Sequence, residues 1–313
     1  MWNLARRWKG QIGRQLYRFK RTPQLDFVII GAEKAGTTML QEVLRATRRV
    51  SMPSSEVRYF RDPFYDQPHL LHDEIVRFPA GDLIGIKHPS YLAVPHAAER
   101  LHAHNPRMKL VVSLRDPADR AISAYYHYLS RGQIPLRRAD EGLRLLLSDQ
   151  RHMAPKYEHI YQFSRYYTHL RRYFELFPAE QILVLEFERL SQDAAAWQRL
   201  FDFLGIDDPI PNPIPTCNPG TYRWKQCVVR HFHHRLTCVH DAEMNLIASD
   251  EQRLVPAAEA RDLFATMLDH LGDSLAEDQV SNETLQMLVD AFRPEVEGLQ
   301  TAGWLTPQAW ANY

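Results

Sequence analysis

The chain has 313 residues, and 45% of them are hydrophobic, which is enough for a sizeable buried core. Its 38 basic and 38 acidic side chains give a formal net charge of zero, so no global field attracts nucleic acid. Three cysteines are too few for a disulfide framework, and a reducing cytoplasm is the expected compartment.

The first 21 residues carry seven Lys or Arg and no acidic residue, so residues 1–22 are predicted to form a basic extension outside the main domain. Large apolar residues recur there at roughly helical spacing, which indicates an amphipathic helix lying on the inner face of an anionic membrane. An extension that docks on the domain, or simply frays, is the alternative. No run of 18 apolar residues occurs and no apolar h-region follows the basic start, so neither a transmembrane helix nor a secretory signal is expected.

Residues 27–40 read FVIIGAEKAGTTML, and this stretch predicts a strand, a phosphate-binding loop and a helix in that order. Gly31 and Gly36 bracket the loop at a spacing that lets backbone N–H groups turn inward. A helix that begins near Thr37 adds the positive end of its dipole to the same point. The stretch therefore predicts a site for a phosphate or a sulfate ester.

The loop differs from the P-loop of nucleoside triphosphatases, GxxxxGK[ST], in the position of its lysine. Thr37 stands where that lysine belongs, and the lysine lies inside the loop as Lys34. This disfavours a nucleoside triphosphatase. It favours a shorter anion, with Lys34 placed to reach the bond that breaks.

Apolar strands alternate with helices after the loop, a pattern typical of a parallel sheet covered on both faces. We expect buried strands at 81–89, 109–114 and 181–187, and a short extended segment at 51–60. We expect helices at 37–47, 93–104, 117–131, 160–177 and 191–204, the last one ended by Gly205.

The C-terminal part is predicted to be mostly helical from 228 to 299, after an irregular proline-rich segment at 207–220. A cluster of histidines lies within it, and a solvated helix face is the favoured interpretation. A metal site is the alternative, but beyond Cys238 no cysteine or carboxylate lies at ligand spacing, so no metal is expected. The clustered histidines are His231, His233, His234 and His240.

Two stretches resemble the nucleotide-binding motifs of sulfotransferases that use 3′-phosphoadenosine 5′-phosphosulfate (PAPS). GAEKAGTTML resembles their 5′-phosphosulfate loop, and RDPADRAISAYYHYL resembles their 3′-phosphate motif. The resemblance implies that Arg115 and Ser123 bind the 3′-phosphate, and a planar guanidinium suits that contact. The loop residues that it assigns to the nucleotide are Gly31, Lys34, Ala35, Gly36, Thr37 and Thr38.

Two further elements resemble the catalytic segments of the same family. SSEVRYF resembles the element that contains the general base, which makes Glu56 the candidate base, and we expect nearby Arg58 to hold it ionised. GIKHPSYL resembles an element whose lysine lies where donor and acceptor meet, which makes Lys87 a second catalytic candidate beside Lys34. His88 is either an alternative base or a loop histidine.

The segment between Cys217 and Cys227 resembles a basic loop that covers the nucleotide in Golgi members of the family. The resemblance implies that Tyr222, Arg223 and Lys225 contact PAPS from above. It leaves open whether the two cysteines pair.

We therefore expect an α/β fold, P-loop-like, with three layers around a central parallel sheet. We expect one domain over 23–313, with a helical insertion at about 228–285. The resemblance implies in-line, metal-free transfer of the sulfuryl group from PAPS to a hydroxyl or amine of a carbohydrate, glycolipid or small-molecule acceptor. Adenosine 3′,5′-bisphosphate would be the product. The alternatives are a P-loop small-molecule kinase and a non-catalytic membrane-surface protein with a degenerate nucleotide fold.

Overall fold

The computed structural model describes residues 24–75, 83–190, 192–214, 224–247, 266, 277–306 and 308–313. The chain divides into two compact units, which are considered separately. Unit 1 contains residues 1–32, 36–113 and 169–217, and unit 2 contains residues 33–35, 114–168 and 218–313. The basic extension at 1–22 lies outside the described residues. One domain over 23–313 with an insertion stays a prediction.

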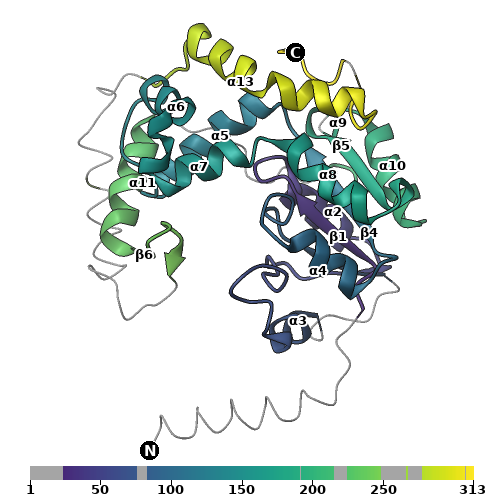
Figure 1. Cartoon of the computed structure of the whole chain (residues 1–313). Coiled ribbons are helices and arrows are strands. Elements are labelled where there is room, and N and C mark those ends of the chain that lie inside the picture. The colour runs from purple at the N-terminus through teal and green to yellow at the C-terminus, as the bar shows by residue number, and fades with distance from the viewer. Residues whose placement is uncertain are drawn as a thin grey trace, which may run out of the picture. The chain divides into compact units, whose positions relative to one another are not determined.

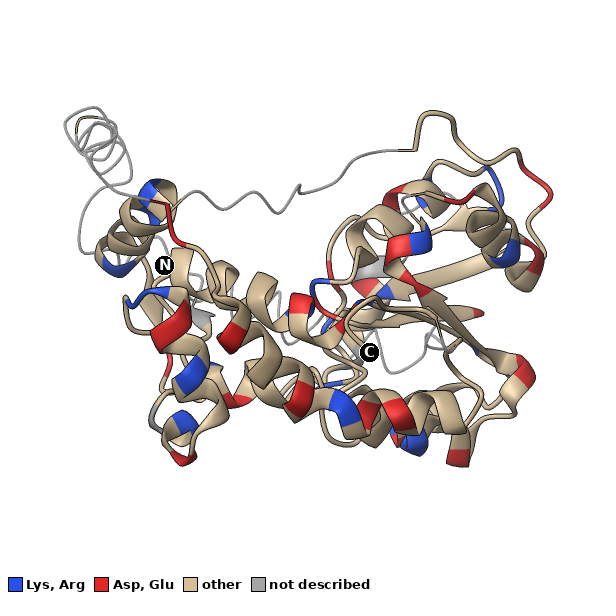
Figure 2. Ribbon diagram, turned by 90° about the horizontal axis from the view of Figure 1, so that it is seen from above, with Lys and Arg blue, Asp and Glu red and all other residues tan. Residues whose placement is uncertain are grey.

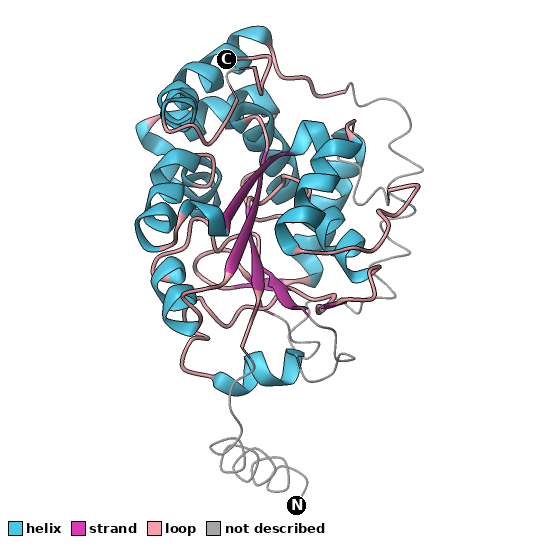
Figure 3. Cartoon of the chain, turned by 90° about the vertical axis from the view of Figure 1, so that its right-hand side faces the viewer, coloured by secondary structure: helices cyan, strands magenta, loops and turns pink. Residues whose placement is uncertain are grey.

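Unit 1 is built on a five-stranded sheet with the strand order β2-β3-β1-β4-β5 (Figures 1 and 3). β1 lies in the middle, and Phe27 pairs in parallel with Gly85 of β3 on one side and with Lys109 of β4 on the other. This confirms the predicted central parallel sheet. The strands are β1 (Phe27–Gly31), β2 (Val50–Ser51), β3 (Leu83–Lys87), β4 (Lys109–Leu114) and β5 (Ile182–Glu186).

Both faces of the sheet are buried. Phe27 and Ile29 of β1 share a core with Leu44 of α2 (Thr37–Arg45) and Trp197 of α10 (Ala194–Leu204). Successive side chains on a strand point to opposite faces, so the fully buried Val28 lies on the other face. The remaining helices of unit 1 are α3 (Pro68–Ile75), α4 (Ala97–His104), most of α8 (Tyr166–Leu176), η2 (Ala179–Gln181) and α9 (Phe187–Leu190).

The prediction of a single helix at 160–177 is wrong, because two helices occupy this stretch. α7 (Pro155–Gln162) ends before α8 begins, and the buried Ser164 lies between them. Its hydroxyl donates to the carbonyl of Ile160 and to that of Pro117, both at 3.3 Å. Serine hydroxyls compete in this way with the helical hydrogen bonds of the backbone. The extended segment expected at 51–60 is also shorter than predicted, since β2 ends at Ser51.

Unit 2 is mainly helical around α5 (Pro117–Ser130), whose buried face packs against residues of four other helices (Figure 1). Asp116 caps α5 by accepting hydrogen bonds from the N–H groups of Ala118 and Asp119, at 2.9 and 3.3 Å, as the sequence indicates. Acidic and basic residues are interspersed along the helices (Figure 2). The other elements are α6 (Ala139–Leu147), η1 (Asp149–Met153), α7, α11 (Trp224–Thr237), the hairpin of β6 (Val239–His240) and β7 (Leu246–Ile247), and α13 (Asn282–Thr301).

Candidate active site

The predicted phosphate loop connects β1 to α2 through a tight left-handed turn. Lys34 has φ 69°, and Gly36, the residue before α2, has φ 76°. A Cβ atom on Gly36 would lie 2.5 Å from the ring of Phe187, so this position needs glycine for space as well as for torsion. No side chain caps the first turn of α2, whose N–H groups are thus suited to an anion.

The amine of Lys34 lies in a strongly basic part of unit 2. Its Nζ lies 3.5 Å from Nδ1 of His127 on α5. Burial lowers the pKa of Lys34, and the charges of Arg131, Arg120 and Arg115 lower it further against the opposing effect of Glu33. Three guanidinium groups therefore contribute to the potential at this amine, which is the environment that a bound phosphate or sulfonate would neutralise.

His127 is held neutral in this cluster. Burial and the neighbouring cations Lys34 and Arg131 lower its pKa from 6.5 to about 3. At neutral pH the ring therefore carries no charge, and Nδ1 can accept a hydrogen bond from Lys34. His127 was not predicted as a site residue from the sequence, although it lies within the stretch that resembles the 3′-phosphate motif.

The acidic residue of the loop, Glu33, is directed away from solvent by two residues of unit 2. Its Oε1 accepts a hydrogen bond from the hydroxyl of Tyr128 at 2.7 Å, and its Oε2 lies 2.9 Å from Nε2 of His159 on α7. Burial alone would raise the pKa of Glu33, but the hydrogen bond and charge of His159, with the charge of Arg120, lower it far below its usual value. Glu33 thus stays ionised and anchors the loop to α5 and α7.

The two residues predicted for the 3′-phosphate both belong to unit 2. Arg115 follows the last residue of β4 and is half-buried, and Ser123 lies within α5. The N-cap Asp116 is fixed between them by Asn312, whose side-chain amide donates to its Oδ2 at 2.7 Å. The C-terminal residues therefore help to hold the start of the motif in place.

Unit 1 brings together three of the predicted site residues. Nζ of Lys87, at the end of β3, lies 3.0 Å from Oε1 of Glu56 and 3.5 Å from Oγ1 of Thr38 on α2. Lys87 is only 3% exposed, whereas the side chain of Glu56 is 46% exposed. A buried amine thus orients a carboxylate that solvent can reach.

Several hydrogen bonds hold the segment that carries Glu56. Gln41 of α2 donates to the carbonyl of Pro53 at 2.6 Å, and the N–H of Val57 donates to the carbonyl of Lys87 at 3.1 Å. The hydroxyl of Tyr91 donates to the carbonyl of Val57 and accepts from the N–H of Phe60 at 3.2 Å. The backbone on both sides of Glu56 is therefore fixed by elements next to the sheet.

Arg58, which was expected to hold Glu56 ionised, is not its ion-pair partner in the structure. The cation paired with Glu56 is Lys87, and the guanidinium of Arg58 lies 5.9 Å from the centre of the Phe64 ring. Lys87 can reach Glu56 because β3, held in the sheet by parallel pairing with β1, ends beside the segment at 53–57.

The ring of His88 contacts two residues that follow it closely in the chain. Its Nδ1 lies 2.8 Å from the hydroxyl of Ser90, and its ring stacks on Tyr91 with the ring centres 4.8 Å apart. The residue is 4% exposed. These contacts favour a structural role over the alternative role as base.

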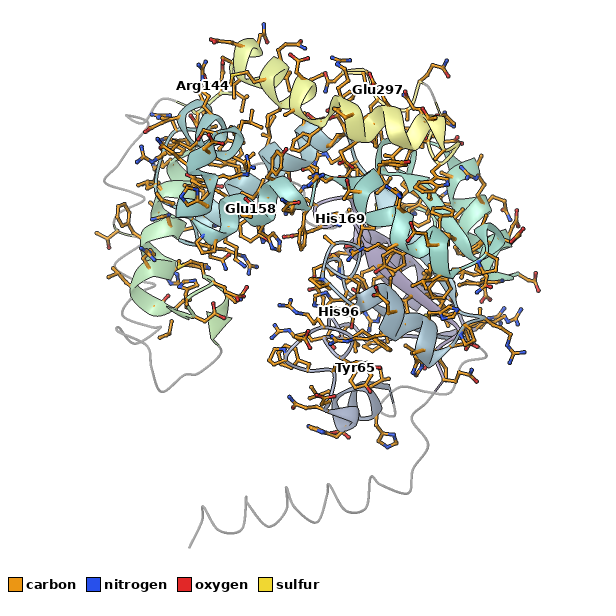
Figure 4. The ribbon with its side chains drawn as sticks, in the orientation of Figure 1. Tyr65, His96, Arg144, Glu158, His169 and Glu297 are labelled. Carbon is orange, nitrogen blue, oxygen red and sulfur yellow. The ribbon has the colours of Figure 1, made fainter. Side chains whose placement is uncertain are left out.

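A pocket of about 440 Å³ opens on unit 1 at α4, and Figure 4 labels two of its lining residues, Tyr65 and His96. The guanidinium of Arg100 lies 4.3 Å from the centre of the Tyr65 ring and donates to Asp62 at 2.8 Å. The pocket is lined by Tyr65, His96, Glu99, Arg100 and Ala103.

Part of the predicted nucleotide clamp lies outside the described residues, namely Cys217, Tyr222 and Arg223. Lys225 is half-buried in the first turn of α11. Cys227 is a buried free thiol, and burial raises its pKa to about 12.

The histidines of α11 have structural contacts, such as that of His231 Nδ1 with the carbonyl of Leu129 at 2.8 Å. Within the described ranges, no group of three His, Cys, Asp or Glu side chains is placed to hold a metal ion. Among those same residues, none of the helices has the length and apolar character needed to span a bilayer.

Comparison with known proteins identifies the family. Residues 24–214 match the sulfotransferase domain family. Heparan sulfate glucosamine 3-O-sulfotransferase 3B1 of Mus musculus is 33% identical over 189 residues, which cover 60% of this chain and 47% of that protein. The bifunctional heparan sulfate N-deacetylase/N-sulfotransferase 2 of Homo sapiens is 28% identical over 200 residues, which cover 58% of this chain and 22% of that protein. The chain thus spans about half the length of the first relative and a smaller part of the second one.

A solved structure agrees with this assignment at the level of the fold. The crystal structure of a sulfotransferase from Alicyclobacillus acidocaldarius matches with a TM-score of 0.53 and 22% identity, covering 68% of this chain and 93% of that one. The P-loop-like α/β fold and the resemblance to the sulfotransferase family are therefore confirmed. Because the family match spans more than half of the 313 residues, the chain belongs to the sulfotransferase domain family.

Proposed function

We propose that the protein is a PAPS-dependent sulfotransferase. The observation that carries the proposal is the half-buried amine of Lys34, held in a left-handed turn and influenced by Arg115, Arg120 and Arg131. Such an amine is suited to an anion that carries more than one charge. Family membership supports the same activity.

In this proposal the residues present fit a nucleotide with two anionic ends. The loop N–H groups and Lys34 would bind its 5′ end, and Arg115 and Ser123 would bind its 3′-phosphate. Lys225 and the other clamp residues would add contacts from the segment that follows Cys217. No metal is required, because charge on the nucleotide would be offset by these cations.

The reaction would be a single in-line displacement. The acceptor oxygen or nitrogen attacks sulfur while the bond from sulfur to the bridging oxygen of the 5′-phosphate breaks. Glu56 takes the acceptor proton, and adenosine 3′,5′-bisphosphate leaves. Lys34 would stabilise charge on the bridging oxygen, and Lys87 would orient Glu56 and steady the sulfonate.

The acceptor would be a hydroxyl or amine of a carbohydrate, a glycolipid or a small molecule. The names of the two relatives specify sulfation of heparan sulfate, which supports the carbohydrate class. We infer a cytoplasmic protein with peripheral membrane contact through residues 1–21, and no nucleic-acid partner.

Incubation of the protein with radiolabelled PAPS and separate pools of oligosaccharides, glycolipids and small alcohols tests this function. Label should move to one pool in the presence of a metal chelator, and Glu56→Gln should abolish most of the transfer. Magnesium-dependent transfer from ATP, or no transfer to any pool, would contradict the proposal in favour of the kinase or of the non-catalytic alternative, respectively.

A further inference from the structure

Arg120 is a buried cation for which no pairing is visible. It lies on α5, and it is 0% exposed. Within the part of the chain that the structure describes, none of its three guanidinium nitrogens has a hydrogen-bond partner. Burying a charge without a hydrogen-bonded partner is costly, so proteins seldom keep one unless something binds it.

The position of Arg120 on α5 places it beside the phosphate loop. Residues three, seven and eleven positions later share its helical face, and they are Ser123, His127 and Arg131. His127 contacts the amine of Lys34 at 3.5 Å, so this face of α5 is the one next to the loop. The charge of Arg120 also lowers the pKa of Lys34, as expected for a close neighbour.

Glu33 does not satisfy the guanidinium. Its two carboxylate oxygens are engaged by the hydroxyl of Tyr128 and by Nε2 of His159. Its charge offsets that of Arg120 through space, which lowers the pKa of Glu33, but the donor hydrogens of Arg120 are not used. Arg120 thus has five N–H donors in a buried, basic setting.

We propose that Arg120 binds an oxygen of the nucleotide at its 5′ end, together with Lys34. This rests on the proposed function and adds a ligand beyond Arg115 and Ser123, which the motif resemblance assigns to the 3′-phosphate. Arg120 would contact the 5′-phosphate itself, so the contact persists in the product adenosine 3′,5′-bisphosphate.

Calorimetric titration of the purified protein tests this with adenosine 3′,5′-bisphosphate and with adenosine 3′-phosphate, which lacks the 5′ group. Arg120→Gln should weaken binding of the bisphosphate by about 10- to 100-fold, the range for a hydrogen bond to a charged group. It should leave binding of adenosine 3′-phosphate nearly unchanged. Arg120→Lys should retain part of the affinity for the bisphosphate. Arg144→Gln, on the exposed part of α6, is the matched control and should bind like the wild type (Figure 4).

A purely structural role predicts different results. If Arg120 only balances Glu33, then Glu33→Gln combined with Arg120→Gln should restore both the melting temperature and the affinity of the bisphosphate. The proposal predicts that the double variant regains thermal stability but not affinity. It also predicts that Glu33→Gln alone tightens bisphosphate binding, a result that remains measurable if Arg120→Gln fails to fold.

Wild-type affinity in Arg120→Gln, or an equal loss for both nucleotides, would overturn the assignment of Arg120 to the 5′ end. Failure of the wild-type protein to bind either nucleotide would instead overturn the proposed function.

Discussion

Lys87 and Glu56 form an ion pair in which the amine is buried and the carboxylate is not. The distance from Nζ to Oε1 is 3.0 Å, with 3% of the lysine side chain and 46% of the glutamate side chain exposed. The rigid partner lies at the end of a sheet strand, and the exposed partner lies on an irregular segment. This arrangement lets the sheet fix the orientation of the proposed base while leaving it open to an acceptor.

Glu56→Gln should lower turnover by about 10²-fold or more, the usual effect of losing a general base. The amide keeps the size of the side chain and can still accept a hydrogen bond from Lys87, so nucleotide affinity should not change. Steady-state rates and calorimetric binding measure the two effects. His88→Asn should lower turnover much less. A larger loss of turnover in His88→Asn than in Glu56→Gln would show that the base is misassigned.

Arg115→Ala should remove most of the thermal stabilisation that adenosine 3′,5′-bisphosphate gives to the folded protein. The shift arises by mass action on the folded state, so it reports binding without turnover. ATP should give a much smaller shift in the wild type. An equal shift from ATP would count against a sulfotransferase nucleotide.

Acid should destabilise the protein through His127, whose pKa is lowered to about 3 by burial, Lys34 and Arg131. In the unfolded chain this histidine takes up its proton near pH 6.5, so between these values the unfolded state binds more protons. Its contribution to stability is therefore complete above pH 6.5 and is lost as the pH falls toward 3.

Urea unfolding at several pH values measures this dependence. His127→Gln should give a shallower loss of stability between pH 6.5 and 4 than the wild type. His152→Gln, at an exposed position of η1, should keep the wild-type slope. A slope that both variants share with the wild type would mean that other groups, such as the half-buried His234 with a pKa of about 4, account for it.

Gly36→Ala should destabilise the protein more than Gly205→Ala. Both glycines have nearly the same positive φ, 76° and 75°, so both substitutions bear a torsional cost of about 1–2 kcal/mol. A Cβ at Gly205 meets nothing within 4 Å, whereas one at Gly36 meets the Phe187 ring at 2.5 Å. Chemical unfolding gives the free energy of unfolding of both variants, and the difference between them reports the clash with Phe187. Equal losses of stability would contradict the tight packing of the loop.

Residues 1–21 are expected to bind anionic vesicles at low salt and to release them at high salt, because salt screens the attraction. A chain that starts at Pro23 should stay in the supernatant while keeping its transferase activity. If the full-length protein also stays in the supernatant, the extension is a tail or a docking segment.

The sequence predicted those parts of the fold that depend on local pattern. β1 and β4 were found from their apolar runs, and the start of α5 from Asp116 and Pro117. The break at Ser164 was missed, because the amphipathic pattern continues through it and only the hydroxyl contacts reveal it.

Motifs selected Lys34, Glu56 and Lys87 as site residues, and their roles in the site stay predictions. The contacts of Glu33 were not predictable from the sequence, because its partners Tyr128 and His159 lie 95 and 126 positions away in the chain. The ion pair of Lys87 with Glu56 was missed for the same reason, since it depends on strand β3 ending beside the segment at 53–57.

At Lys34 the left-handed backbone lowers the thermal stability of the folded protein, while the amine of the same residue serves the proposed chemistry. An L-amino acid other than glycine has a standing cost of about 1–2 kcal/mol in this conformation. Lys34→Gly would relax the turn and delete the amine in one step. Selection for thermal stability without selection for turnover should therefore favour loss of this lysine. A laboratory evolution experiment of that kind would yield a more stable but inactive protein.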